Sequence, residues 1–176
     1  MTQPCHSVSK EQTVLKLMSL LVKRIAKAEM PIRVRRSDLL NSDRDLLITM
    51  FRRHLAADYA EERFDWLYLQ GPHGPAFAWI ASDSASGEPI GAAAAFPRKV
   101  YCNGQEKLGF VLGDFCMNED FRSLGPSLQL QRACVAAALQ NPFEFFYDFP
   151  SIGMMAVYKR LGFVQTATLV RWVRLL

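Results

Sequence analysis

The chain has 176 residues, a length that fits a single domain. Half of the residues are hydrophobic and 22% are charged, so the composition supports a packed core and excludes an intrinsically disordered chain. No apolar run approaches the roughly 18 residues of a membrane span, and the first residues lack the apolar core of a secretory signal, so we expect a soluble cytoplasmic protein.

The net charge of +4 is concentrated near the N-terminus. The first 36 residues hold eight basic and two acidic side chains, whereas the other 140 residues hold thirteen basic and fifteen acidic side chains. A body so close to neutrality is not typical of a nucleic-acid-binding protein. The four cysteines and three histidines are scattered, which argues against a metal site and against a disulfide-stapled scaffold.

Residues 10–28 are expected to form a basic amphipathic helix within an N-terminal extension, residues 1–31. Three interpretations are open for this helix: contact with an anionic membrane surface, docking to a partner, or ordinary packing on the domain. We favour ordinary packing because Leu20 interrupts the basic face. The apolar side holds Val14, Leu17, Met18, Leu21, Ile25 and Ala28, and the basic side holds Lys16, Lys23 and Lys27.

The domain itself, expected at residues 32–176, begins with a strand and two helical segments. Ser42 is suited to be a helix N-cap, with Asp45 as its partner three residues later. The expected elements are a strand at Ile32–Arg36, a helix from Ser42 to about Leu55, a helical stretch at Glu61–Leu69 and a loop at Gln70–Pro75.

Two β-hairpins are expected in the middle of the chain. The Asn103-Gly104 pair is a strong turn signal, and Ser84–Pro89 has turn composition. The strands expected beside these turns are Ala76–Ala81, Ile90–Phe96, Val100–Cys102 and Phe110–Met117.

Helices and strands alternate in the last part of the chain, which predicts parallel pairing there and an α/β (α+β) class. Pro126 suits the first position of a helix, and Gly162 suits the end of one. The expected elements are a helix at Pro126–Leu139, a strand at Phe143–Phe149, a helix at Ile152–Leu161 and one long strand at Phe163–Leu176.

The most informative stretch is Leu112–Ala133, where a strand runs through a short turn into a helix. Free N–H groups at a helix N-terminus attract anions, and the helix dipole adds to this attraction. Gly125 in the turn allows the backbone to approach a ligand oxygen closely. A diphosphate group would fit such a turn.

This stretch resembles the cofactor motif of the GNAT superfamily of N-acetyltransferases, in which Arg or Gln is followed after two residues by Gly and, two residues on, by Gly or Ala. Here the motif runs from Arg122 through Gly125 to Ser127. Ala156–Phe163 is similar to the second motif of the superfamily, a helix that ends in Tyr-x-x-Leu-Gly-Phe. The resemblance extends from Ile32 to the C-terminus and implies a mixed, mainly antiparallel twisted sheet with flanking helices and a splayed central strand pair.

The resemblance implies an N-acyltransferase that uses acetyl-CoA, or another acyl-CoA, as co-substrate and needs no metal. The acceptor would be the amine of a small molecule or of a protein, attacking the thioester directly. Main-chain groups of the splayed strand would pair with the pantetheine arm, and the turn would hold the pyrophosphate. The residues implied are Phe115, Cys116 and Met117 for the strand, and Arg122, Ser123, Leu124, Gly125, Pro126 and Ser127 for the turn.

Three residues depart from the family pattern. Ser127 stands where Gly or Ala is usual, Pro126 removes one N–H from the turn, and Ser151 stands where many members have Asn. These departures leave open an acyl carrier protein in place of free coenzyme A. They also keep a second hypothesis open, a catalytically silent module with the same fold that serves in binding or assembly.

The proton-transfer groups are less clearly marked. By the resemblance, Tyr158 protonates the departing thiolate, and the alternative is a core tyrosine with a satisfied hydroxyl. Asp114 is the leading candidate for the general base because burial disfavours the charged carboxylate, although a structural acceptor is equally consistent with its position. Asp148 is the second candidate. Strand alternation directs Asp114 away from Phe115 and Met117.

Only thirteen residues follow Phe163, and they contain no turn residue, so the domain lacks room for the two final strands typical of the superfamily. An exposed edge carrying Val170, Trp172 and Leu175 would favour association. We therefore expect a homodimer that forms through the C-terminal edge strand, or another pairing at this edge. The chain is also consistent with one half of an ancestral two-domain protein.

Overall fold

The computed structural model describes residues 31–39, 41–138 and 144–168. Within them, a five-stranded sheet has the order β1-β2-β3-β4-β5. The first four strands are antiparallel neighbours, and β5 pairs parallel with β4, so the expected mixed, mainly antiparallel sheet is confirmed. The strands are β1 (Ile32–Arg36), β2 (Phe77–Asp83), β3 (Pro89–Cys102), β4 (Gln105–Met117) and β5 (Phe145–Tyr147).

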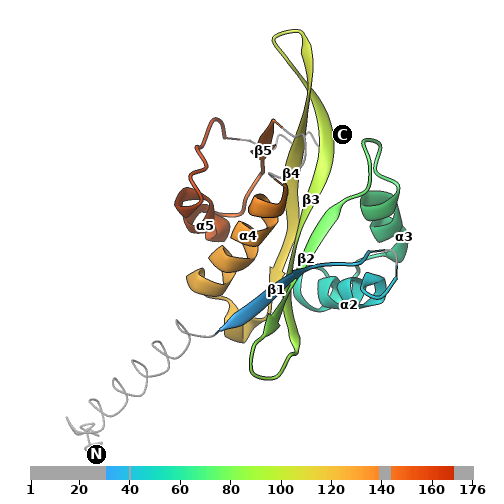
Figure 1. The fold of residues 1–176 in the computed structure, drawn as a ribbon, viewed down its shortest axis with the longest axis vertical. Coiled ribbons are helices and arrows are strands. Elements are labelled where there is room, and N and C mark those ends of the chain that lie inside the picture. The colour runs from blue at the N-terminus through green and yellow to red at the C-terminus, as the bar shows by residue number, and fades with distance from the viewer. Residues whose placement is uncertain (1–30, 40, 139–143, 169–176) are drawn as a thin grey trace, which may run out of the picture.

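Helices cover both faces of the sheet (Figure 1). On one face lie α2 (Arg44–His54) and α3 (Glu61–Phe64), the latter continued by a π-helical turn at Asp65–Leu69; on the other lie α4 (Leu124–Ala138) and α5 (Met155–Arg160). Because strand side chains alternate between faces, Ile80 packs under α2 and α3, whereas its neighbour Trp79 belongs to the core under α4. Among the described helices, none has the length and hydropathy to cross a membrane.

A β-bulge interrupts β4 close to its end. Ala92 of β3 pairs with Cys116 and Ala94 pairs with Gly113, so Asp114 and Phe115 together oppose a single residue of β3. Asp114 has a φ of 44°, a left-handed conformation that Asp adopts more readily than most residues.

The bulge lies where β4 and β5 diverge. Their register runs only from Gly109↔Phe145 to Val111↔Tyr147, whereas β4 continues to Met117. The described part of the chain therefore leaves one edge of Leu112–Met117 without a strand partner, which is the splayed pair expected from the resemblance. This divergence opens the space in which the site lies.

The two hairpin strands are longer than expected. β3 is continuous from Pro89 to Cys102, so the prediction of two separate strands at Ile90–Phe96 and Val100–Cys102 was wrong. The turn was predicted correctly: Asn103 and Gly104 both have positive φ, at 52° and 77°. This tight turn sets the pairing of β3 with β4, which begins at Cys102↔Gln105. The pairing continues without a register shift through Pro97↔Phe110 to Ala94↔Gly113.

Two helix starts differ from the expected ones. The N-cap of α2 is Asp43 and not Ser42, and the Asp43 side chain bonds no helix N–H because its carboxylate accepts from Arg35 and from the N–H of Asp38. The helix α4 begins at Leu124, so Pro126 lies within its first turn and not at its first position. A proline is tolerated there because an N–H in the first turn has no helical carbonyl to bond.

The C-terminal part departs most from expectation. Residues 163–168 form no strand, so the described part of the predicted strand Phe163–Leu176 was wrong. Gly162, with φ of 85°, turns the chain, and the Phe163 N–H bonds the carbonyl of Tyr158, which makes this segment the cap of α5. The predicted helix at residues 10–28, Phe143, and the residues Val170, Trp172 and Leu175 lie outside the described residues.

Candidate active site

A cavity of about 460 Å³ lies beside the end of β4. Three elements form its walls: the last residues of β4, the turn into α4, and the segment that leads into α5. One residue from α2 completes it. The lining residues are Phe115, Cys116 and Met117; Arg122, Ser123, Leu124 and Ser127; Ser151, Gly153, Met154, Ala156 and Val157; and His54.

The structure brings together seven of the nine residues that the resemblance assigns to the acyl donor, all except Gly125 and Pro126. These two lie between Leu124 and Ser127 in the first turn of α4, within the same backbone segment. Leu124 and Gly125 are the first two residues of α4. Their N–H groups have no acceptor within the helix, because the carbonyl four residues earlier lies outside it. The turn thus has the donors that an anion requires.

Arg122 connects the turn to the strand. Its Nη2 donates to the carbonyl oxygen of Met117 at 3.2 Å, and its backbone N–H bonds the carbonyl of Glu119 at 3.2 Å. At the start of the turn, the Asn118 side chain accepts the N–H of Asp120 at 3.0 Å. These contacts give the connection between β4 and α4 a defined shape, with a guanidinium held at the cavity wall.

Asp114 lies outside the cavity, on the sheet face that α2 and α3 cover. Its carboxylate accepts the hydroxyls of Tyr59 at 3.2 Å and Tyr68 at 3.1 Å, and Arg63 lies at 3.4 Å. The side chain is 10% exposed. Burial, followed by the nearby Asp114 charge, raises the pKa of both tyrosines, so both hydroxyls remain protonated donors. The bulge thus places Asp114 in a network of three donors.

Tyr158 and Asp148 form a pair at the end of β5. Tyr158 is 5% exposed, does not line the cavity, and packs against the ring of Phe163 at a centroid distance of 5.0 Å. Burial raises the pKa of its hydroxyl, and the hydrogen bond with Asp148 raises it further. Burial also raises the pKa of Asp148, although the bond from Tyr158 opposes this. The preceding residues of α5, Ala156 and Val157, do line the cavity.

Sequence reasoning missed His54, the last residue of α2, and the α5 residues that close the cavity. No local pattern marks His54, because its place in the site depends on how α2 packs across the sheet. Burial lowers the pKa of the His54 imidazole, and the charges of Arg53 and Arg122 lower it further, with Glu119 opposing. Cys116, also at the wall, has its pKa raised to about 12 by burial.

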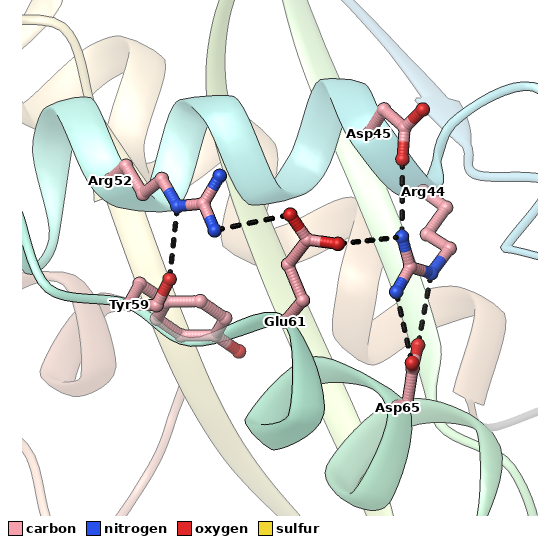
Figure 2. Close-up of polar contacts among 6 residues, drawn as sticks. All are labelled: Arg44, Asp45, Arg52, Tyr59, Glu61 and Asp65. Carbon is pink, nitrogen blue, oxygen red and sulfur yellow. Dashed lines mark hydrogen bonds and ion pairs between the residues drawn. The ribbon is translucent and has the colours of Figure 1, made fainter.

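Ion pairs and hydrogen bonds of charged side chains hold α2 against α3 (Figure 2). Arg44 donates two hydrogen bonds of 2.9 Å to Asp65, and Glu61 lies between Arg44 and Arg52, at 3.5 and 3.3 Å. Arg52 also donates to the carbonyl of Tyr59 at 3.0 Å. The network therefore holds the α2–α3 connection that carries Tyr59 to Asp114. Phe64 and Tyr68 stack in the core beneath it, whereas Trp66 is 60% exposed.

The described residues contain no group of three or more His, Cys, Asp or Glu side chains placed to hold a metal ion.

Comparison of the sequence with protein-family models and with curated proteins gives no match. Solved structures do match. Glucosamine-6-phosphate N-acetyltransferase from Arabidopsis thaliana is 10% identical, with a TM-score of 0.60 over 81% of this chain and 98% of that one. AAC(6')-Iy, solved in complex with the bisubstrate analogue CoA-S-monomethyl-acetylneamine, is 20% identical, with a TM-score of 0.63 over 83% of this chain and 99% of that one. A predicted acetyltransferase from Clostridium acetobutylicum, solved with acetyl-CoA, is 17% identical, with a TM-score of 0.62 over 81% and 96%.

Proposed function

The chain has the fold of the GNAT N-acetyltransferases, and we propose that it is an N-acyltransferase that moves an acetyl or other acyl group from coenzyme A to an amine. The observation that carries this proposal is the cavity that joins the free edge of β4 to the first turn of α4. A fold by itself does not establish an activity, so the argument depends on what the cavity walls can bind.

The residues present fit an acyl-CoA. The pairing of β4 with β5 ends at Val111, so the edge of residues 115–117 that faces the β5 side has no described strand partner. An extended ligand with amide groups can pair with such an edge. The first turn of α4 and the Arg122 guanidinium suit a diphosphate. Among the described residues that line the cavity, none is Asp or Glu, and the positive charge of Arg122 favours an anion. The thioester of the donor supplies the activated acyl group.

Protons are handled, in this proposal, by Asp148 and Tyr158. The raised pKa of Asp148 makes it a better proton acceptor than an ordinary carboxylate. Tyr158 is the proposed donor to the departing sulfur. Its pKa lies above that of a thiol, near 8.5, so the hydroxyl keeps its proton and stabilises the thiolate mainly through a hydrogen bond. The two residues share a hydrogen bond, so Asp148, once it has taken the amine proton, can donate to the Tyr158 oxygen and release the phenolic O–H to the sulfur.

The contacts of Asp114 favour a structural role, as a hydrogen-bond acceptor, over a role as general base. Its carboxylate already accepts two hydroxyls and faces Arg63, on the sheet face that α2 and α3 cover. We therefore propose that Asp114 holds the β4 bulge in place and leaves proton transfer to the pair on the β5 side. Positioning the bulge in turn positions the main chain of Phe115 and Cys116.

A silent binding module remains the competing proposal, favoured by one observation: none of Asp114, Asp148 and Tyr158 lines the cavity. Thermal unfolding with acetyl-CoA, free coenzyme A and ATP tests whether the cavity is used. A ligand at about 100 times its dissociation constant stabilises the fold by about 2.7 kcal/mol. We expect this increase with acetyl-CoA and coenzyme A and not with ATP. Donor binding would be contradicted if acetyl-CoA and coenzyme A gave no stabilisation, or if ATP stabilised the fold equally.

The acceptor is the next unknown, and the similar structures suggest where to begin. They include glucosamine-6-phosphate and aminoglycoside acetyltransferases, both named for amino-sugar acceptors. We propose an amine acceptor, either a small molecule or a protein side chain, and a first screen with glucosamine 6-phosphate, an aminoglycoside and a lysine peptide. Acyl transfer to any of them separates an enzyme from a silent module that only binds the donor.

A further inference from the structure

His54 and Arg122 line the same cavity from different elements, the end of α2 and the turn into α4. We infer that His54 is a second cationic contact for the phosphate groups of the acyl donor, and that protonation of its imidazole strengthens donor binding. This inference rests on the proposed function, because it concerns the same cavity. Nothing in the local sequence around His54 indicates this role, which arises only from the packing of α2.

The backbone of His54 is held firmly enough to aim its side chain. It ends an eleven-residue helix whose inner face is anchored in the core by Leu47 and Phe51, both 0% exposed. The next residue, Leu55, bonds the carbonyl of Phe51 at 2.9 Å. Arg52, two residues earlier, is fixed to the Tyr59 carbonyl and to Glu61. The half-buried His54 side chain therefore projects from a rigid end of α2.

The charges around His54 suit an anion. Arg53 precedes it on α2, Arg122 and Glu119 belong to the connection between β4 and α4, and Cys116 of β4 keeps its proton because burial raises its thiol pKa. The α5 segment contributes Ser151, Gly153, Met154, Ala156 and Val157 to the wall, none of them charged. The charges of two arginines and one glutamate act on the imidazole, and an anionic ligand relieves this positive excess.

The linkage has a definite sign. Burial and the two arginines lower the pKa of His54 from its ordinary value of 6.5 in the protein without donor. A phosphate beside the ring favours the imidazolium, so the pKa rises when the donor binds. Between these two pKa values, binding takes up a proton, and affinity for the donor therefore increases as the pH falls.

Calorimetry with free coenzyme A tests this without knowledge of the acceptor. The wild type is compared with His54→Gln and with the control His73→Gln, at about pH 6 and about pH 8, in two buffers of different ionisation enthalpy. His73 lies in the loop before β2, where its Nδ1 accepts the N–H of Lys99, and it does not line the cavity. The phosphomonoester of coenzyme A also titrates near pH 6, but it does so equally in all three proteins.

We expect the wild type and His73→Gln to bind coenzyme A about tenfold more tightly than His54→Gln at the lower pH, with proton uptake that the His54 variant lacks. At the higher pH, the three proteins should agree within about twofold. Equal affinity and equal proton uptake in wild type and His54→Gln would overturn the inference but leave donor binding intact. Absence of coenzyme A binding by the wild type would remove the proposed function and this inference together.

A second measurement does not depend on the folding of the variant. The imidazole C–H resonance of His54 is followed by NMR through a pH titration of the wild type, with and without coenzyme A. We expect the ligand to raise the pKa of His54. An unchanged His54 titration at saturating coenzyme A contradicts the inference.

Discussion

Gly109 of β4 lies directly against the aromatic ring of Phe145 in β5. The two residues are register partners, and a Cβ atom at position 109 would lie 2.5 Å from Cε2 and 2.6 Å from Cζ of that ring. The absence of a side chain on Gly109 lets the ring cover the strand and brings β5 close to β4. Only beyond Tyr147 do the strands part, so this contact lies at the base of the space that contains the cavity.

Replacement of Gly109 by Ala should therefore displace the Phe145 ring or push the two strands apart. We expect a decrease of about 1–2 kcal/mol in the free energy of unfolding, measured by chemical denaturation. Gly153→Ala is the matched control, because the atom nearest to its added Cβ, Ser151 Oγ, is 3.9 Å away. Full stability of Gly109→Ala would show that the Phe145 ring or β5 moves without cost and that the contact does not set the strand spacing.

The Asp43–Arg35 pair predicts a specific loss of stability in acid. Arg35 donates to the two carboxylate oxygens at 2.6 and 2.7 Å, the Asp38 N–H adds a third bond at 2.7 Å, and the Asp43 side chain is 3% exposed. The bonds from Arg35 lower the pKa of Asp43, against the effect of burial. This contribution is therefore complete above the unfolded pKa, near 3.9, and is lost as the pH falls through the lower folded value.

Asp43→Asn should lower the free energy of unfolding by about 2 kcal/mol at neutral pH. The difference from wild type should shrink in strong acid, where the wild-type carboxylate is also protonated. Asp45→Asn serves as control, since the Asp45 carboxylate is 93% exposed, and its stability should match the wild type. An acid-independent deficit in Asp43→Asn would assign the effect to packing and not to charge.

Tyr158→Phe tests the proposed donor to the leaving thiolate. Loss of the hydroxyl should reduce the rate of acyl transfer about 100-fold. The thermal shift caused by acetyl-CoA should change little, because the proposed hydrogen bond to sulfur strengthens only as the thiolate forms. Tyr101→Phe is the control, since its hydroxyl bonds Glu106 at the far end of the β3–β4 hairpin. Equal rates in Tyr158→Phe and wild type would leave Tyr158 as a core residue.

Asp114→Asn separates a structural role from a catalytic one. We expect a decrease of about 2 kcal/mol in the free energy of unfolding, and a decrease of about 1 kcal/mol in Tyr68→Phe, because each change removes part of the same hydrogen-bonded network. The pH profile of the remaining activity should keep its shape. A large loss of rate at unchanged stability, with loss of the acidic limb of the profile, would restore Asp114 as the general base.

The prediction of a homodimer through the C-terminal edge remains open to direct test. The residues that suggested it, Val170, Trp172 and Leu175, lie outside the described part of the chain. Light scattering at working protein concentration should give the mass of a dimer, and Trp172→Lys should return the mass of a monomer, because a charge at a strand edge opposes pairing. A monomeric wild type at every concentration would contradict the prediction.

The sequence alone determined what depends on local chemistry. The Asn103-Gly104 turn, the helix stop at Gly162 and the turn from Arg122 to Ser127 into a helix all follow from backbone preferences of a few adjacent residues. Alternation of apolar and charged residues was enough to find β1, and a compact apolar run was enough to find most of β2. The order of these elements, together with the resemblance carried by two spaced motifs, predicted the mixed sheet.

Only the tertiary structure decided what depends on contacts between distant segments. The bulge at Asp114 exists because β3 and β4 pair out of step there, and its carboxylate faces two tyrosines more than forty residues away in the sequence. His54 reaches the cavity because α2 packs across the sheet, and Tyr158 is tied to Asp148 because β5 and α5 meet at that end. Such relationships leave no periodic trace in the sequence, since burial and long-range packing, not local preference, produce them.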